Sequence, residues 1–137
     1  MPEFREITLP EVTLRAAIEG EGPLVLMVHG FPESWYSWRH QMGPIAEAGF
    51  TACAIDVRGY GGSSRPPAIE DYDMEHMVGD VAGVIEALSP GAPAVLVGHD
   101  WARRSSGTPP WSAPTACAPS PACRCPIPAC PSGRTPI

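Results

Sequence analysis

The stretch Ala94-Val95-Leu96-Val97-Gly98-His99-Asp100-Trp101-Ala102 decides the fold that this sequence predicts. It opens with four apolar residues, as expected of a strand that is covered on both faces. The residues that follow place a small side chain two positions before and two positions after Asp100. Small neighbours let a strand turn sharply into a helix without colliding with adjacent strands, and they lift the central side chain clear of the sheet. The stretch therefore predicts a buried strand over 94–97 that carries Asp100 to the edge of a sheet.

Four further strands are expected before this stretch. Alternating apolar residues predict a hairpin of half-buried strands over 4–9 and 12–18, with Pro10-Glu11 as the turn. Continuous apolar runs predict two more strands over 24–28 and 51–55, each covered on both faces as in a parallel sheet. The chain thus begins with an antiparallel pair and continues with buried strands.

Two helices are expected between the buried strands, each with a capping side chain at its start. They are 35–41, capped by Ser34 and continued over 45–48 after an interruption at Gly43-Pro44, and 74–88, capped by Asp73. Strands that alternate with helices predict an α/β fold whose later strands are parallel.

Polar clusters follow three of the buried strands directly. They occupy residues 29–32, 56–63 and 98–102. Ligands of parallel sheets bind at the carboxyl ends of the strands, so these clusters are expected to form one site.

The Asp100 carboxylate is the candidate nucleophile of that site. An aspartate is ionised at neutral pH without a partner base. It can attack a saturated carbon and form an alkyl ester, which favours epoxides or alkyl halides as substrates over carboxylic esters. A second interpretation of the same spacing is that Asp100 caps the helix that follows it.

Three ordered motifs carry a resemblance to a known family. They are HGFPESWYSWRHQ at 29–41, DVRGYGGSS at 56–64 and VGHDW at 97–101. Over about residues 4–101 the chain resembles the α/β-hydrolase superfamily, and within it the soluble epoxide hydrolases. The resemblance implies that Asp100 is the nucleophile and that the backbone N–H groups of Phe31 and Trp101 form the oxyanion hole. It implies a small apolar epoxide or alkyl halide as substrate, and no cofactor.

The remaining motif residues are expected to have structural roles. His29 and His99 hold loops by hydrogen bonds, Asp56 and Arg58 brace the junction after their strand as an ion pair, and the glycines at 59, 61 and 62 supply turn geometry. Gly59, Gly61 and Gly62 are not a phosphate cradle, because the lysine and helix of a P-loop are missing. The other motif positions in this group are Gly30, Pro32 and Gly98. Trp35, Trp38 and Trp101 could line an apolar pocket or belong to the core.

Composition excludes several classes of protein. Fifteen acidic residues against nine basic ones give a net charge of −6, which argues against a nucleic-acid surface. The longest mainly apolar run, 23–28, is far shorter than the roughly 20 residues that a membrane-spanning helix needs. The amino terminus lacks the pattern of a secretory signal, so a cytoplasmic location is expected.

The composition changes after Trp101. All fifteen acidic residues lie in 1–101, whereas 102–137 hold nine of the eighteen prolines and four of the five cysteines. We expect 1–101 to be the amino-terminal part of an α/β-hydrolase domain, and 102–137 to be a non-native or disordered tail, because this tail has too little apolar surface to fold. Zinc is not expected, since the tail cysteines lack a CxxC pair. A disulfide framework is not expected either, because it would need an oxidising compartment and the sequence shows no secretory signal that supports one.

A frameshift in the coding sequence would explain the composition of residues 102–137. If one nucleotide was lost after the Trp101 codon, residues 102–111 can be restored to Gly-Ala-Pro-Ile-Val-Trp-Asn-Thr-Ala-Leu, which continues the family's pattern. The source DNA tests this hypothesis.

Turnover by these 137 residues is not expected. The resembled family places an acid and a histidine after its nucleophile, and no Asp, Glu or His follows Asp100. The lid of that family is absent too, and 94–97 would be left as an apolar sheet edge.

Two alternatives remain open. A haloalkane dehalogenase uses the same aspartate chemistry, although Phe31 stands where many dehalogenases have asparagine. A catalytically silent fragment could instead bind partners through its proline-rich tail.

Overall fold

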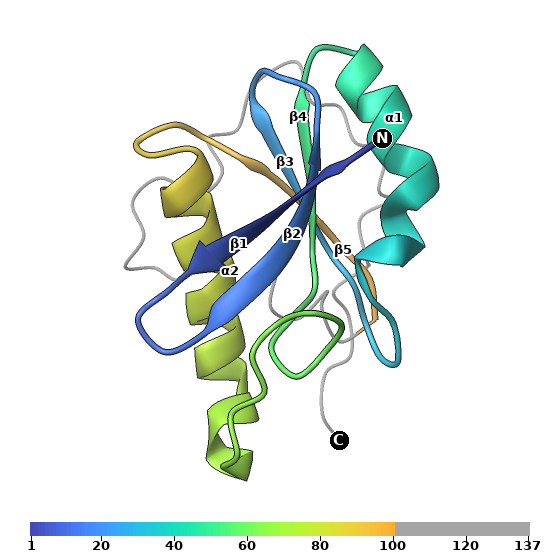
Figure 1. The fold of residues 1–137 in the computed structure, drawn as a ribbon. Coiled ribbons are helices and arrows are strands. Elements are labelled where there is room, and N and C mark those ends of the chain that lie inside the picture. Colours follow the sequence, from blue (N-terminus) through green and yellow to red (C-terminus); the bar gives the residue numbers. More distant parts are fainter. Residues whose placement is uncertain (101–137) are drawn as a thin grey trace, which may run out of the picture.

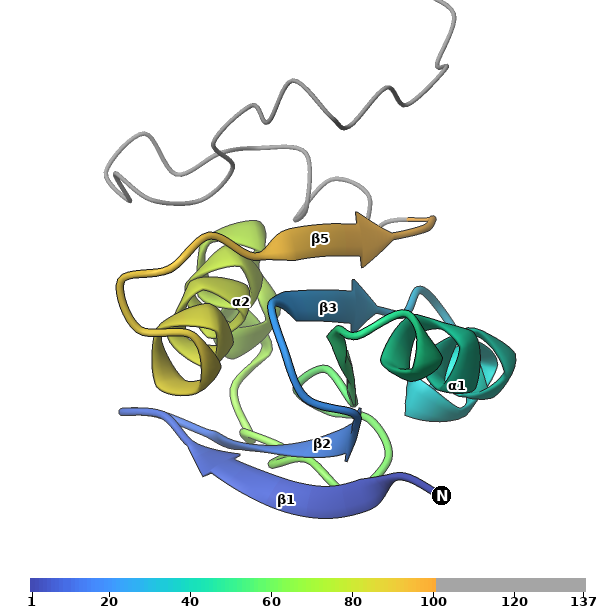
Figure 2. The ribbon, with the colours of Figure 1, turned by 90° about the horizontal axis from the view of Figure 1, so that it is seen from above.

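The computed structural model describes residues 1–100 of the chain (Figure 1). Trp101 and the predicted tail 102–137 lie outside the described residues. The described part is a five-stranded sheet with the order β1-β2-β4-β3-β5. Figure 2 shows helix α1 (Arg39–Glu47) and helix α2 (Met74–Leu88) on opposite faces of that sheet. The α/β architecture expected from the sequence is confirmed.

An antiparallel hairpin forms one side of the sheet, as predicted. Strand β1 (Glu3–Thr8) pairs with β2 (Thr13–Glu19) from Glu3 opposite Ile18 to Thr8 opposite Thr13. Only Ile7 of β1 is buried, because β1 is an edge strand, so it is more exposed than the expected half-buried pattern. Strand β2 then pairs antiparallel with β4, which joins the hairpin to the rest of the sheet.

Two parallel strands form the centre of the sheet, with the bounds that their apolar runs predict. They are β3 (Leu24–Val28) and β4 (Thr51–Ile55), paired in parallel from Leu24 opposite Thr51 to Val28 opposite Ile55. Every residue of β3 is buried. Because side chains alternate along a strand, β3 contributes to two cores. Leu24, Leu26 and Val28 pack in the cluster that includes Val81 and Val84 of α2, whereas Val25 and Met27 pack with Met42 of α1.

The last described strand is β5 (Val95–Gly98), which pairs in parallel with β3. The parallel direction and the predicted position at the sheet edge are confirmed within residues 1–100, but the prediction of a buried strand is wrong. Within residues 1–100, β5 lies at the sheet edge, and the side chain of Val95 is 48% exposed. Full burial needs a neighbour on both sides, and the described residues supply one only on the β3 side.

The first predicted helix forms with a different internal structure. A 3₁₀ turn, η1 (Trp35–Trp38), begins at Ser34, whose side chain accepts a hydrogen bond from Tyr36 N, and α1 follows. The expected interruption at Gly43-Pro44 is wrong, since α1 continues through Pro44. The residue before a proline is normally restricted by its Cβ, and Gly43 has none. The helix ends at the predicted place, where Gly49 N–H donates to the Ala46 carbonyl oxygen at 3.0 Å.

The second predicted helix is confirmed at both ends. Asp73 accepts a hydrogen bond from His76 N at 2.9 Å at the start of α2, and the helix ends at Leu88. Met77, Val81 and Val84 of α2 are buried. No helix within residues 1–100 is long and apolar enough to cross a membrane. Trp35 and Trp38 pack against the core beneath α1.

Candidate active site

The carboxyl ends of β3 and β5 bring the predicted nucleophile to the predicted oxyanion loop. Phe31 N–H donates to Asp100 Oδ2 at 3.1 Å. Asp100 is exposed and has φ of 57°, a left-handed conformation that few residues other than glycine adopt. A strained backbone that presents an exposed carboxylate directly after a strand is the geometry expected of a nucleophile elbow.

Gly30 makes this close approach possible. A Cβ atom added at Gly30 would lie 2.6 Å from Asp100 Cβ and 2.9 Å from Asp100 Oδ2. Both distances are shorter than any ordinary contact of a Cβ atom. Asp100 therefore occupies the space that a side chain at position 30 would fill.

His29 connects the ends of β3 and β4. Its Nδ1 lies 2.8 Å from the Gly30 carbonyl oxygen, and its Nε2 accepts a hydrogen bond from Val57 N–H at 3.1 Å. A ring that accepts at Nε2 is neutral and carries its proton on Nδ1. Burial lowers the pKa of His29, which favours this neutral form. The expected loop-holding role of His29 is present in the structure.

His99 connects the elbow to the loop after β3. Its Nε2 lies 2.8 Å from Glu33 Oε2, and its ring lies 5.4 Å from the ring of Trp38. Glu33 N–H also donates to the Gly30 carbonyl oxygen at 3.1 Å, which makes residues 30–33 a turn. The turn at residues 30–33 is thus linked through Glu33 to His99, the residue before Asp100.

Asp56 is a buried structural carboxylate at the end of β4. Its Oδ1 accepts from Trp35 N–H at 2.9 Å, and its Oδ2 accepts from Arg15 Nε at 2.8 Å and from Gly62 N–H at 3.0 Å. Arg15 Nη2 lies 2.7 Å from the same Oδ2. These donors join β2, β4, η1 and the following loop at one point.

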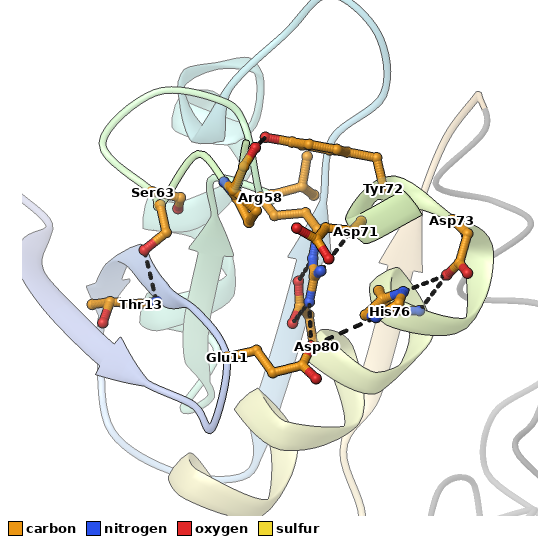
Figure 3. A network of polar contacts seen from close by, with 12 residues as sticks. Glu11, Thr13, Arg58, Ser63, Asp71, Tyr72, Asp73, His76 and Asp80 are labelled. Atoms are coloured by element: carbon orange, nitrogen blue, oxygen red, sulfur yellow. Dashed lines mark hydrogen bonds and ion pairs between the residues drawn. The ribbon is translucent and has the colours of Figure 1, made fainter. Parts of the chain in front are cut away.

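The predicted ion pair between Asp56 and Arg58 is wrong. Arg58 is 2% exposed and pairs with Asp80 of α2, with Nε to Oδ2 and Nη2 to Oδ1 both at 2.7 Å (Figure 3). Arg58 Nη1 also donates to the Asp71 carbonyl oxygen. Asp56 and Arg58 both brace the loop after β4, as expected. Each does so with a partner from a distant part of the sequence, Asp56 with Arg15 and Arg58 with Asp80.

Turn geometry explains Gly59 and Gly61, as expected. Gly59 has φ of 86° and Gly61 has φ of 49°. A Cβ atom at Gly59 would overlap the ring of Tyr72, and one at Gly61 would overlap the carboxylate of Asp56. Because these two glycines lack side chains, the loop packs directly against the Tyr72 ring and the Asp56 carboxylate.

Comparison with known proteins assigns the family. The sequence profile of the alpha/beta hydrolase fold family matches residues 23–102. The chain belongs to the alpha/beta hydrolase fold family. It is 48% identical over 98 residues to epoxide hydrolase B of Mycobacterium tuberculosis, a match that covers 72% of this chain and 27% of that protein. It is 48% identical over 94 residues to bifunctional epoxide hydrolase 2 of Mus musculus, covering 68% of this chain and 17% of that protein.

Solved structures give the same result. An epoxide hydrolase from an endophytic Streptomyces superposes with a TM-score of 0.74 at 47% identity, covering 77% of this chain and 32% of that chain. An epoxide hydrolase from Vigna radiata superposes with a TM-score of 0.73 at 42% identity, covering 76% of this chain and 33% of that chain. The chain therefore spans about a third or less of the lengths of these relatives.

The remaining predicted positions of this alpha/beta hydrolase lie around the elbow. Gly98 is the last residue of β5, and Pro32 follows Phe31 through a cis peptide bond. Trp101, the second predicted oxyanion donor, lies outside the described residues. Sequence reasoning missed Arg15 and Asp80. Asp80 lies between Met77 and Val84 on the apolar face of α2, and a charged residue there indicates a buried partner.

Proposed function

We propose that this site opens small apolar epoxides through nucleophilic attack by Asp100. The hydrogen bond from Phe31 N–H to Asp100 Oδ2 carries the proposal, because it orients an exposed carboxylate on a left-handed elbow. The epoxide hydrolases among the relatives support the epoxide as substrate class. Asp100 Oδ1 is the attacking atom, since Oδ2 is the oxygen held by the backbone.

The first step forms one bond and breaks one. Oδ1 donates an electron pair to a ring carbon of the epoxide, and the bond between that carbon and the ring oxygen breaks. The ring oxygen leaves with the electron pair and takes a proton from water. The product is a hydroxyalkyl ester of Asp100, and every atom of the epoxide is retained in it.

The second step hydrolyses the ester to a diol. A water molecule attacks the ester carbonyl carbon and gives one proton to the solvent, and negative charge develops on the carbonyl oxygen. The bond between the carbonyl carbon and the ester oxygen then breaks. The diol leaves with that ester oxygen and the second proton of the water, and Asp100 is released as a carboxylate. Phe31 N–H already contacts Oδ2 and would stabilise that charge, together with Trp101 N–H. Removing one such donor typically slows a reaction by ~10²–10³.

For a polypeptide of these 137 residues we propose that the reaction stops at the ester. Hydrolysis needs a base to activate water, and no Asp, Glu or His follows Asp100 in the sequence. Asp56 cannot take this role, because it is fully buried and its oxygens are held by Arg15, Trp35 N–H and Gly62 N–H. The ester is then expected to accumulate to one equivalent per chain.

Mass spectrometry of the full chain after exposure to styrene oxide tests the proposal. The expected result is one adduct on Asp100 whose mass equals that of the intact epoxide. The chain also contains cysteine thiols, which epoxides can alkylate. Hydroxylamine distinguishes the two products, since it cleaves an ester and leaves a thioether intact.

Asp100→Asn is the matched control. Asparagine adopts the left-handed conformation as readily as aspartate, so the elbow is preserved while the nucleophile is lost. No hydroxylamine-sensitive adduct is expected in this variant. An unlabelled Asp100 in the original chain, or diol formed over many cycles, contradicts the proposal. Halide release from 1-chlorobutane without any reaction of the epoxide would assign dehalogenase chemistry to the site instead.

A further inference from the structure

Tyr60 contacts the two residues that flank Gly30. Its ring centroid lies 5.3 Å from that of His29 at an interplanar angle of 74°, and 6.5 Å from that of Phe31 at 86°. Both are edge-to-face arrangements within the favourable range for aromatic pairs. Tyr60 belongs to the loop after β4, so it brings a third segment of the chain to the oxyanion loop.

The loop that carries Tyr60 is fastened to β2. Ser63 Oγ donates to the Asp56 carbonyl oxygen at 2.6 Å and accepts from Arg15 N–H at 2.9 Å. Ser64 N–H donates to the Thr13 carbonyl oxygen at 2.9 Å. The buried pair of Arg58 and Asp80, drawn in Figure 3, fastens the start of the same loop to α2. The backbone under Tyr60 is therefore fixed on two sides.

The Phe31 side chain has much less support. It is 65% exposed, and Tyr60 is its aromatic partner within residues 1–100. The next residue, Pro32, has no N–H with which to anchor the backbone. The peptide that carries the Phe31 N–H group is held at its carbonyl end, where the Gly30 oxygen lies 2.8 Å from His29 Nδ1 and accepts from Glu33 N–H at 3.1 Å. Tyr60 packs against both His29 and Phe31, so it supports the side chains on both sides of this peptide.

We propose that Tyr60 is a positioning residue for the oxyanion loop. Its ring holds Phe31 so that the Phe31 N–H group points at Asp100 Oδ2, which leaves Oδ1 free to attack. The effect on the rate rests on the proposed ester-forming function. The effect on the Phe31 amide does not, because it concerns a hydrogen bond within the protein.

Three variants of Tyr60 separate its ring from its hydroxyl and from its bulk. Tyr60→Ala removes both aromatic contacts, and Tyr60→Phe retains them. Tyr60→Leu keeps apolar volume without a ring, and it replaces the alanine variant if that variant does not fold. Tyr36→Ala is the control, since Tyr36 is an exposed aromatic residue on η1 that lies beneath the Arg39 guanidinium.

The first measurement is the ¹H–¹⁵N resonance of the Phe31 amide during a pH titration of the full chain. An amide that donates to a carboxylate shifts as that carboxylate titrates. We expect this shift in the original chain, in Tyr60→Phe and in Tyr36→Ala, and its loss in Tyr60→Ala or Tyr60→Leu. General destabilisation would not remove the response of this one amide. A response unchanged in Tyr60→Ala or Tyr60→Leu overturns the proposal.

The second measurement is the rate of ester formation on Asp100 at increasing styrene oxide concentration. Loss of the aromatic contacts should lower the limiting rate about three- to tenfold and leave the half-saturating concentration unchanged, with Tyr60→Phe restoring the rate. A change in the half-saturating concentration alone would make Tyr60 a substrate contact and overturn the positioning role. If no variant and not even the original chain forms the ester, the proposed function fails, and the amide titration decides the role of Tyr60.

Discussion

Gly30→Ala should disable the nucleophile while the fold is retained. The new Cβ atom would lie 2.6 Å from Asp100 Cβ, whereas ordinary contacts of a Cβ atom begin at 3.4 Å. Asp100 must therefore move by roughly 0.8 Å, which stretches its 3.1 Å hydrogen bond from Phe31 N–H beyond the range of a useful bond. A misplacement of about 1 Å at a reacting group costs about 10²-fold in rate, or roughly 2.7 kcal/mol of activation free energy.

The assay is the rate of ester formation on Asp100, with urea unfolding of each variant measured in parallel. Gly79→Ala is the matched control, because a Cβ atom at Gly79 of α2 meets nothing within 4 Å. That substitution should leave the rate unchanged and stabilise the helix by up to about 1 kcal/mol. If Gly30→Ala folds and forms the ester within about threefold of the original rate, the steric reasoning is refuted.

Three further predictions concern the supporting structure. Asp80→Ala leaves the buried Arg58 guanidinium without its bidentate partner and should lower the free energy of unfolding by about 3–5 kcal/mol in urea titrations; a loss below about 1 kcal/mol would contradict a buried pair. The hydrogen bond to Asp73 raises the pKa of His76 above 6.5, so its stabilisation is complete below about pH 6.5 and is lost as the pH rises through the folded-state pKa. His76→Gln should remove that step from the pH dependence of the urea midpoint, and a step that persists would assign it to another group. Gly61→Ala should destabilise the fold, because φ of 49° strains a residue that has a Cβ atom and the buried Asp56 carboxylate leaves no room for that atom; thermal unfolding at the original midpoint would disprove this.

Strand and helix bounds could be predicted from the sequence where a few neighbouring residues determine them. The bounds of β3 and β4 follow from continuous apolar runs, and the start of α2 follows from a capping aspartate at position 73. Pro44 is the exception, since its effect depends on whether the residue before it carries a Cβ. The proximity of Asp100 and Phe31 could be predicted from the sequence, because parallel strands end at the same edge of a sheet.

Long-range partners could not be predicted in the same way. Asp56 meets Arg15 because β2 lies beside β4 with Ala16 opposite Ile55, and no local pattern specifies that pairing. Sequence reasoning instead joined Asp56 to the nearest opposite charge in the chain, Arg58. The actual partner of Arg58 lies on the apolar face of α2.

Asp56 and Asp100, which follow two strands at this edge of the sheet, differ in how fully their carboxylate oxygens are satisfied by hydrogen bonds. Asp56 is buried and receives hydrogen bonds on both oxygens from Arg15 and from two backbone N–H groups. Within residues 1–100, Asp100 is exposed and receives one hydrogen bond, on Oδ2, from Phe31 N–H. A carboxylate with every oxygen held by donors is stabilised as an anion and is a poor nucleophile, whereas one held on a single oxygen is oriented and keeps a free electron pair. The same residue type thus serves as an anchor after β4 and as the candidate nucleophile after β5, and the environment at each strand end decides which.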